Sequence, residues 1–509
     1  MPNVAGASDA TTGSVLLVLA IALPVAGILL SLVLGGRHAE RIALVLLPIG
    51  LAVASTAFFQ VNRAHHSLAY IVGGWAPPLG IALRADGLSA TMMIAAAIVV
   101  CAVGIFARAD FHTPADVSEA RAPFAFWILL LAIWSAMNLL LVASDLFTLY
   151  VALELLTFAA VPLVSLDGRA ETLQAALRYL IFAILGSVFY LAGAALLYGA
   201  YGTLDITLLS ERVHADGATI AAGALMTAGL LAKTAVFPLH LWLPPAHAGA
   251  PAAASALLSA LVVKGSFFLL VRLWFDVMPA VPGAAGTQML GAFGAGAILF
   301  GNVLALRQQR LKLLVAYSTV AQLGYLFLMF PLAFNTASST IQSGGALTGG
   351  ILQAISHATA KGAMFMSAGL MYTALGHDRI AGLTGIGRLL PMTVVAFALG
   401  GVSLIGLPPS GGFLAKWLLL GTAAVTGQWW WAATMLVGGL LTAGYMFLIL
   451  SRAMTTAHEP VKLQTSIPHY PQAAALALAL CSLLLGFVAF GSFDTVQIGR
   501  PAAPQVGLR

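Results

Sequence analysis

Five ionisable side chains lie well inside apolar stretches of this sequence: Glu154, Lys233, Lys264, Lys361 and Lys416. A charged group at the centre of a membrane helix costs roughly 2.5–3.5 kcal/mol on insertion scales. One lysine can extend its ammonium group to the membrane surface, but five such residues together indicate groups that face one another or a hydrated path. Because carboxylates and amines can take up and release protons, proton transfer is the predicted chemistry.

Histidines extend this set of titratable groups. His357 precedes Lys361 by four residues, so both side chains lie on one face of a helix. An unperturbed imidazole titrates near neutrality and suits a proton relay. A lone histidine is more often a packing residue, so His240 and His247 are only accessory candidates.

We therefore predict that protons move along a row of six residues: Glu154, Lys233, Lys264, His357, Lys361 and Lys416. We also hypothesise that Glu154 contacts Lys233. Making and breaking that contact would switch the lysine between holding and releasing a proton.

The sequence offers little for other chemistry. The two cysteines, Cys101 and Cys481, lie in apolar stretches without a CxxC pair, which argues against disulfides and iron–sulfur ligation. No carboxylate or cysteine accompanies the histidines, so a metal site is the weaker interpretation. The basic residues are scattered, which argues against nucleic acid as a partner, and we expect no cofactor. Asp145 is predicted to cap the helix that follows it.

The composition requires a membrane environment for these residues. Of 509 residues, 61% are hydrophobic and 8% are charged, whereas soluble domains carry about 25% charged residues. A spanning helix needs roughly 20 apolar residues, and about fourteen segments qualify. They begin near Ser14, Arg41, Leu88, Phe124, Asp145, Ala175, Gly217, Ala252, Gly286, Leu313, Gly349, Pro391, Gln428 and Gln472.

Two predicted helices contain residues that interrupt helical hydrogen bonding. Pro238 lies in the seventh, and the segment Gly406–Gly412 lies in the twelfth. Ordinary proline kinks are the alternative, but interruptions at matching positions indicate the inverted repeats of transporters.

We expect one all-α transmembrane domain, residues 1–509, with two inverted five-helix repeats. It would contain helices 1–3 (14–123), helices 4–8 (124–275), helices 9–13 (286–452) and a last helix (472–491). With fourteen spans, both termini lie on the same side. Placing them on the non-cytoplasmic side puts most loop lysines and arginines inside, as membrane proteins prefer.

Several motifs resemble one superfamily. They are Leu146–Phe158 with Tyr150 and Glu154, Ala232–Pro244 followed by Ala250 and Pro251, Arg310–Tyr325, His357–Lys361 and Gly412–Lys416. Their order and spacing resemble the antiporter-like membrane subunits shared by respiratory complex I, Mrp-type Na⁺/H⁺ antiporters and membrane-bound hydrogenases. Within this superfamily, the segment Ile81–Ala107 is most similar to the D-type subunit of Mrp antiporters. Pro245, Leu153 and Lys416 depart from residues common in parts of the superfamily.

The resemblance implies a hydrated central axis across both repeats. Glu154 and Lys233 would be the coupled pair of the first half, and Lys264 would bridge to His357 or Lys361. Lys416 would be the exit-side site in the broken twelfth helix. The resemblance also implies other membrane subunits as partners and a bacterial inner-membrane location.

The leading interpretation is a proton-translocating subunit of a multisubunit membrane complex, with Na⁺ transport left open. The parent complex is either a cation/proton antiporter or a redox pump such as an NADH:quinone oxidoreductase or a hydrogenase. Because the chain shows no redox site, enzymatic activity would lie in partner subunits. A self-contained secondary transporter and a non-conducting scaffold subunit are the two alternatives.

Overall fold

The computed structural model describes residues 15–114, 117, 119–342, 344–456, 463–488 and 495–500. Within these ranges, eleven helices are long and apolar enough to cross a membrane. They are α1 (Val15–Leu34), α2 (Gly36–Ala64), α3 (Gly87–Ala107), α4 (Arg121–Val142), α5 (Leu146–Val164), α6 (Ala170–Tyr201), the continuous helix Ala252–Val277, α12 (Gly283–Leu306), α13 with α14 (Leu311–Phe327 and Met329–Ala333), α19 (Trp429–Met454) and α20 with η5 (His469–Leu484 and Leu485–Phe487). Ser14 and positions 489–491, which belong to the predicted first and last spans, lie outside the described residues.

The other three predicted spans are also helical. The eleventh is α15 (Gly345–Leu375). The seventh consists of α8 (Gly217–Thr234) and α9 (Leu243–Gly249), and the twelfth consists of α17 (Pro391–Ile405) and α18 (Gly411–Val425). The gaps contain Pro238 and residues 406–410, within the two segments where the sequence predicts interruptions. An all-α membrane protein of about fourteen helices is therefore confirmed, whereas the pairing of helices 4–8 with 9–13 as inverted repeats stays a prediction.

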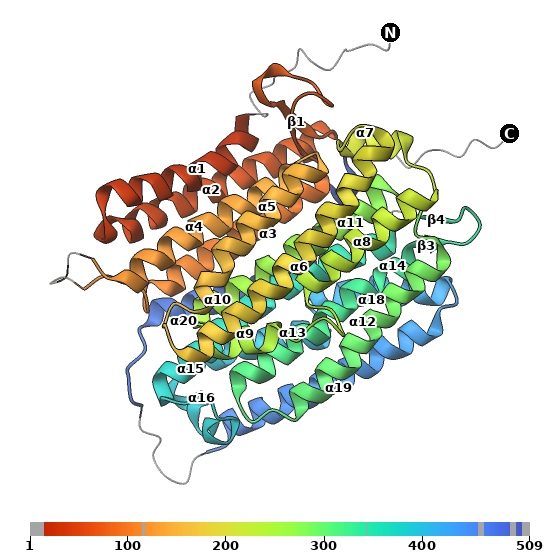
Figure 1. Ribbon diagram of the computed structural model, residues 1–509. Helices are drawn as coiled ribbons and strands as arrows, with labels where there is room; N and C mark the ends of the chain where they lie inside the picture. The colour runs from red at the N-terminus through yellow and green to blue at the C-terminus, as the bar shows by residue number, and fades with distance from the viewer. Residues whose placement is uncertain are drawn as a thin grey trace.

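Short elements connect the helices at the two ends of the bundle. β1 (Leu68–Ile71) pairs antiparallel with β2 (Ala82–Ala85), and β3 (Phe334–Asn335) pairs with β4 (Thr340–Ile341). The remaining short helices are η1 (Val72–Gly74), α7 (Ile206–Arg212), η4 (Ile380–Leu383) and α16 (Ile386–Leu389). Figure 1 shows β1, β3, β4 and α7 at one end of the helices and α16 at the opposite end. The β1–β2 hairpin lies between the second and third predicted spans.

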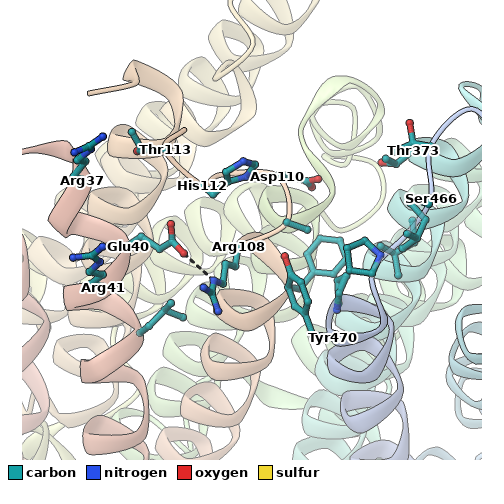
Figure 2. Close-up of a pocket in the computed structure, with 18 of the residues that line it drawn as sticks. Arg37, Glu40, Arg41, Arg108, Asp110, His112, Thr113, Thr373, Ser466 and Tyr470 are labelled. Atoms are coloured by element: carbon teal, nitrogen blue, oxygen red, sulfur yellow. Dashed lines mark hydrogen bonds and ion pairs between the residues drawn. The ribbon is translucent and has the colours of Figure 1, made fainter. Parts of the chain in front are cut away.

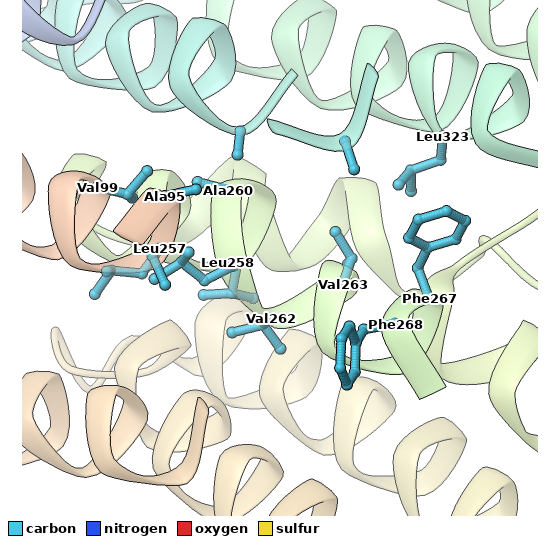
Figure 3. Packing of buried hydrophobic residues seen from close by; sticks show 14 of the residues in the cluster. Ala95, Val99, Leu257, Leu258, Ala260, Val262, Val263, Phe267, Phe268 and Leu323 are labelled. Carbon is cyan, nitrogen blue, oxygen red and sulfur yellow. The ribbon is translucent and has the colours of Figure 1, made fainter. Parts of the chain in front are cut away.

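The eighth span is the buried centre of the molecule. It runs through α10 (Ala252–Leu257), η2 (Leu258–Val262), α11 (Val263–Val271) and η3 (Arg272–Val277), and all of its residues are buried. Figure 3 shows its apolar side chains packed between residues of α3 and Leu323 of α13. η2 and η3 are π-helical turns. Such turns are rare and occur mostly at functional sites, and apolar periodicity does not predict them.

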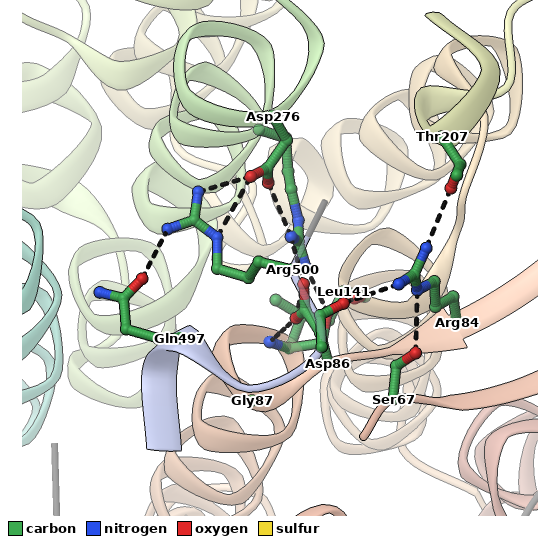
Figure 4. A network of polar contacts seen from close by, with 12 residues as sticks. Ser67, Arg84, Asp86, Gly87, Leu141, Thr207, Asp276, Gln497 and Arg500 are labelled. Carbon is green, nitrogen blue, oxygen red and sulfur yellow. Dashed lines mark hydrogen bonds and ion pairs between the residues drawn. The ribbon is translucent and has the colours of Figure 1, made fainter. Parts of the chain in front are cut away.

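Ion pairs hold the end of this central helix that lies beside β1 and α7. Arg272 donates to Asp86, the residue that caps α3, at 2.5 and 2.6 Å, and to Asp276 at 2.8 Å. Arg500, from the last described segment, donates to the other oxygen of Asp276 at 2.5 Å (Figure 4). Burial raises the pKa of the Asp86 carboxyl, but the charge and hydrogen bonds of Arg272 outweigh burial and hold that pKa below its ordinary value. The pairs thus join α3, the central helix and the carboxyl-terminal segment.

Two glycines allow α6 and α8 to pack backbone against backbone. A Cβ atom on Gly186 would lie 2.6 Å from the carbonyl oxygen of Gly229, and one on Gly229 would lie 2.2 Å from that of Gly186. Small residues at helix contacts are the usual means of close packing in membranes. This contact brings the end of α8, which carries Lys233, next to α5 and α6.

The substitution Gly186→Ala should therefore separate α6 from α8 and lower the midpoint of thermal unfolding, by the equivalent of about 1–3 kcal/mol for overpacking. Gly199→Ala is the matched control, because it lies on the same helix with nothing within 4 Å of an added Cβ. Thermal unfolding of both purified variants in mild detergent measures the difference. Equal midpoints would contradict the close packing of these two helices.

Candidate functional site

Glu154 and Lys233 form the ion pair that the sequence analysis hypothesised. Lys233 lies at the end of α8, one residue before Thr234, where the helix stops. Its Nζ donates to Glu154 Oε1 at 2.9 Å and to Thr157 Oγ1 at 3.0 Å. The lysine side chain is 5% exposed and the glutamate side chain 16%. Ser187 of α6 also donates to Glu154 Oε1, so the carboxylate accepts from two neighbouring helices.

Neither Thr157 nor Ser187 was a candidate in the sequence. Thr157 is one turn beyond Glu154 on α5, and Ser187 is the residue after Gly186 at the α6–α8 contact. A hydroxyl in an apolar span was their only signal, and hydroxyls are common in membrane helices as contacts between helices. Their role depends on which helices are neighbours, which the sequence alone does not give.

Lys264 and His357 make the contact between the two halves of the chain. Lys264 Nζ lies 2.5 Å from His357 Nδ1, and both side chains are fully or almost fully buried. Lys264 also donates to the carbonyl oxygen of Ser259. Ser259 lies in the π-helical turn η2, where regular α-helical hydrogen bonding is interrupted. A single hydrogen bond between two basic nitrogens can carry one proton from one to the other.

Lys361 lies on the same face of α15 as His357 but has different partners. Its Nζ donates to the carbonyl oxygen of Val315 at 2.9 Å and to the hydroxyl of Ser318. Both partners belong to α13, and Lys361 has no exposed surface. The structure thus places His357, and not Lys361, against Lys264, a choice that the sequence left open.

Lys416 lies on α18, and its side chain reaches back across the gap in the twelfth helix. Its Nζ donates to the carbonyl oxygens of Leu404 at 2.6 Å and Ile405 at 3.1 Å, at the end of α17. The ammonium group also lies 4.1 Å from the centre of the Tyr325 ring. Helix carboxyl ends and aromatic faces are both partly negative, so they stabilise a cation where no carboxylate is present.

Two glutamines extend from the Lys416 site toward α15. Gln353 lies four residues before His357 on α15 and donates to Gln322 of α13 at 3.0 Å. Gln322 in turn donates to the carbonyl oxygen of Leu404 at 3.1 Å, the same oxygen that Lys416 binds. Gln353 was missed in the sequence, although its spacing from His357 and Lys361 places all three on one helical face.

His240 and His247 lie outside these hydrogen bonds. His240 is surrounded by Phe237 and Phe300, with ring centres 5.7 and 5.1 Å away, and His247 stacks on Phe365 at 4.6 Å. Both nitrogens of His247 and Nδ1 of His240 are buried without a hydrogen-bond partner among the described residues. A buried polar atom of this kind is normally satisfied by water.

Asp145 has the role that the sequence predicts. Its Oδ1 accepts from the backbone nitrogen of Thr148 at 2.7 Å and so caps α5. In the described parts of the chain, no group of three or more His, Cys, Asp and Glu side chains is placed to hold a metal ion. The buried titratable side chains described above instead contact one another, hydroxyl groups and backbone carbonyls.

Comparisons with known proteins identify the family. Residues 143–442 match the family described as NADH:quinone oxidoreductase/Mrp antiporter, TM. The N subunit of the NADH-quinone oxidoreductase of Desulforudis audaxviator is 34% identical over 440 residues, 84% of each chain. The D subunit of the Na⁺/H⁺ antiporter of Alkalihalophilus pseudofirmus is 27% identical over 485 residues, 88% of this chain and 94% of that one.

A solved structure extends the match over almost the whole chain. One chain of the Mrp complex from Dietzia sp. is 25% identical, with a TM-score of 0.84 over 97% of this chain and 98% of that chain. The family match includes every residue of the predicted proton pathway, from Glu154 to Lys416. This chain therefore belongs to the NADH:quinone oxidoreductase/Mrp antiporter transmembrane family.

Proposed function

We propose that this chain is a proton-translocating subunit of a multisubunit membrane complex. Protons move in the plane of the membrane and pass from one predicted repeat of the protein to the other. The path consists of Glu154, Lys233, Lys264, His357, Lys361 and Lys416. The contact between Lys264 and His357, 2.5 Å long and buried, is the observation that carries the proposal. It joins titratable groups of the two predicted repeats inside the protein, where a proton passes from one nitrogen to the other.

Electrostatics supports a switching role for the first pair. The row contains one carboxylate and four lysines, and among them only Lys233 is paired with the carboxylate in the described chain. Breaking the Glu154–Lys233 pair would leave an ammonium group without its counter-charge, which favours release of its proton to the next group. Thr234 Oγ1 contacts Ser266 Oγ at 2.8 Å, and these hydroxyls offer a short link from α8 to α11.

The parent complex is either a cation/proton antiporter or a redox-driven pump. Relatives of both kinds match this chain at similar coverage. Purification in mild detergent with mass spectrometry of the co-purifying proteins tells the two apart. Small membrane proteins alone favour the antiporter and make Na⁺ dependence the next assay, whereas iron–sulfur, flavin or nickel proteins favour the redox pump.

We further propose that the chain lies in a bacterial inner membrane, with both termini on the non-cytoplasmic side.

A self-contained transporter and a non-conducting scaffold are the competing functions. The first predicts proton or cation movement by the purified chain alone in vesicles. The second predicts that proton movement by the complex survives loss of the buried lysines. Variants of the Glu154–Lys233 pair and of Lys416 distinguish the proposed function from a non-conducting scaffold.

Variants of the first pair separate stability from transport. Glu154→Gln or Lys233→Met alone leaves one buried charge without its partner, so each should lower the unfolding midpoint. The double variant removes both charges and should recover most of that stability. All three should reduce proton movement in sealed vesicles by roughly a hundredfold, the scale of losing one acid–base group. Glu171→Gln, at an exposed position in the first turn of α6, is the control. Transport restored together with stability in the double variant would refute the proposal.

Replacement of Lys416 by arginine tests proton release directly. Arginine keeps the positive charge and can still bind the carbonyls of Leu404 and Ile405, but its guanidinium group does not release a proton in proteins. Lys416→Arg should therefore preserve assembly and the unfolding midpoint while abolishing proton movement. Wild-type proton movement in this variant would show that Lys416 acts only as a fixed charge.

A further inference from the structure

A large cavity lies outside the proton row, where α2, α3 and α20 approach one another. Its volume is about 1410 Å³. Figure 2 shows Arg37, Glu40 and Arg41 on one wall and Tyr470 on the opposite wall, with Arg108 between them. α2 and α20 begin here and α3 ends here. This is the end of the bundle that the loop charges predict to face the cytoplasm.

The mouth of the cavity is rich in cationic groups. Arg37 and Arg41 are four residues apart, so they lie on one face of α2. Arg108 Nε pairs with Glu40 Oε1 at 3.0 Å, which neutralises the charge of that carboxylate. The other carboxylate that lines the cavity is Asp110. Arg41 is exposed and makes no hydrogen bond or ion pair within the described ranges, so its guanidinium group is accessible to an anionic ligand.

The wall below the mouth is apolar and continues into the membrane. Leu44 and Val45 line the cavity directly after Arg41. Val45 is 61% exposed, Ile49 one turn further along α2 is 43% exposed, and Ile105 on the neighbouring α3 is 45% exposed. An occupant that fits this shape has an anionic head at the arginines and an apolar tail along α2.

We propose that this cavity binds an anionic phospholipid, with its phosphate at Arg37 and Arg41 and an acyl chain along Val45 and Ile49. Guanidinium groups bind phosphate oxygens in a bidentate manner, and basic pockets between membrane helices on the cytoplasmic side select anionic headgroups. The lipid fills the space between α2 and α20, which both pack against α3. None of the six residues of the proposed proton path lines this cavity.

The purified full-length chain tests this site through its unfolding midpoint in detergent. Phosphatidylglycerol should raise the midpoint, whereas phosphatidylcholine at the same concentration should not. In Arg41→Gln the half-maximal phosphatidylglycerol concentration should rise about fivefold, and in the double variant with Arg37→Gln it should rise further. Arg63→Gln is the matched control, because Arg63 lies in the last turn of the same helix and should respond like the wild type.

Three outcomes would overturn the proposal. An unchanged phosphatidylglycerol response in the double variant would place the lipid elsewhere. An equal stabilisation by inorganic phosphate would mean that the site takes a free anion and makes no use of the apolar wall. Cross-linking of Arg41→Cys to a neighbouring protein in the purified complex, with no phospholipid retained by it, would assign the cavity to a protein partner.

Discussion

A charge in the interior of a membrane protein needs a partner or water, and this chain buries four lysines in its proposed proton path with one carboxylate. Burying an unpaired ion costs several kcal/mol even after relaxation. The polar architecture follows from this constraint. Glu154 forms an ion pair with Lys233. The other three lysines contact backbone carbonyls, hydroxyls, a histidine and an aromatic ring.

The irregular backbone supplies partners for two of these lysines. A regular helix uses most of its carbonyls internally, so unpaired acceptors are concentrated where helical hydrogen bonding is interrupted. The π-turn η2 provides the carbonyl of Ser259 for Lys264, and the gap after α17 provides those of Leu404 and Ile405 for Lys416. Weak, neutral partners of this kind hold a proton without trapping it, as a relay requires. A row of strong ion pairs would fix each charge in place.

The sequence predicted the parts that depend on local patterns. Apolar length predicts the spans, and prolines and glycines predict the two interrupted helices. Charge inside apolar segments selects five of the six proposed pathway residues, and spacing adds His357 through Lys361. Partners remained unpredicted where distant segments meet: Ser187, Gln353 and Tyr325 gain a role only from the packing of α6 on α8 and of α13 on α15 and α18. The π-turns depend on a single inserted residue, which apolar periodicity does not register.

In the proposed function, protons cross between the two predicted repeats through Lys264 and His357. Proton movement by the intact complex in sealed vesicles should be measured after His357 is replaced by leucine, with complex assembly and the unfolding midpoint recorded in parallel. We expect proton movement to stop while the complex still assembles, because leucine cannot accept a proton from Lys264. Proton movement at the wild-type rate in the assembled His357→Leu complex would rule out this path.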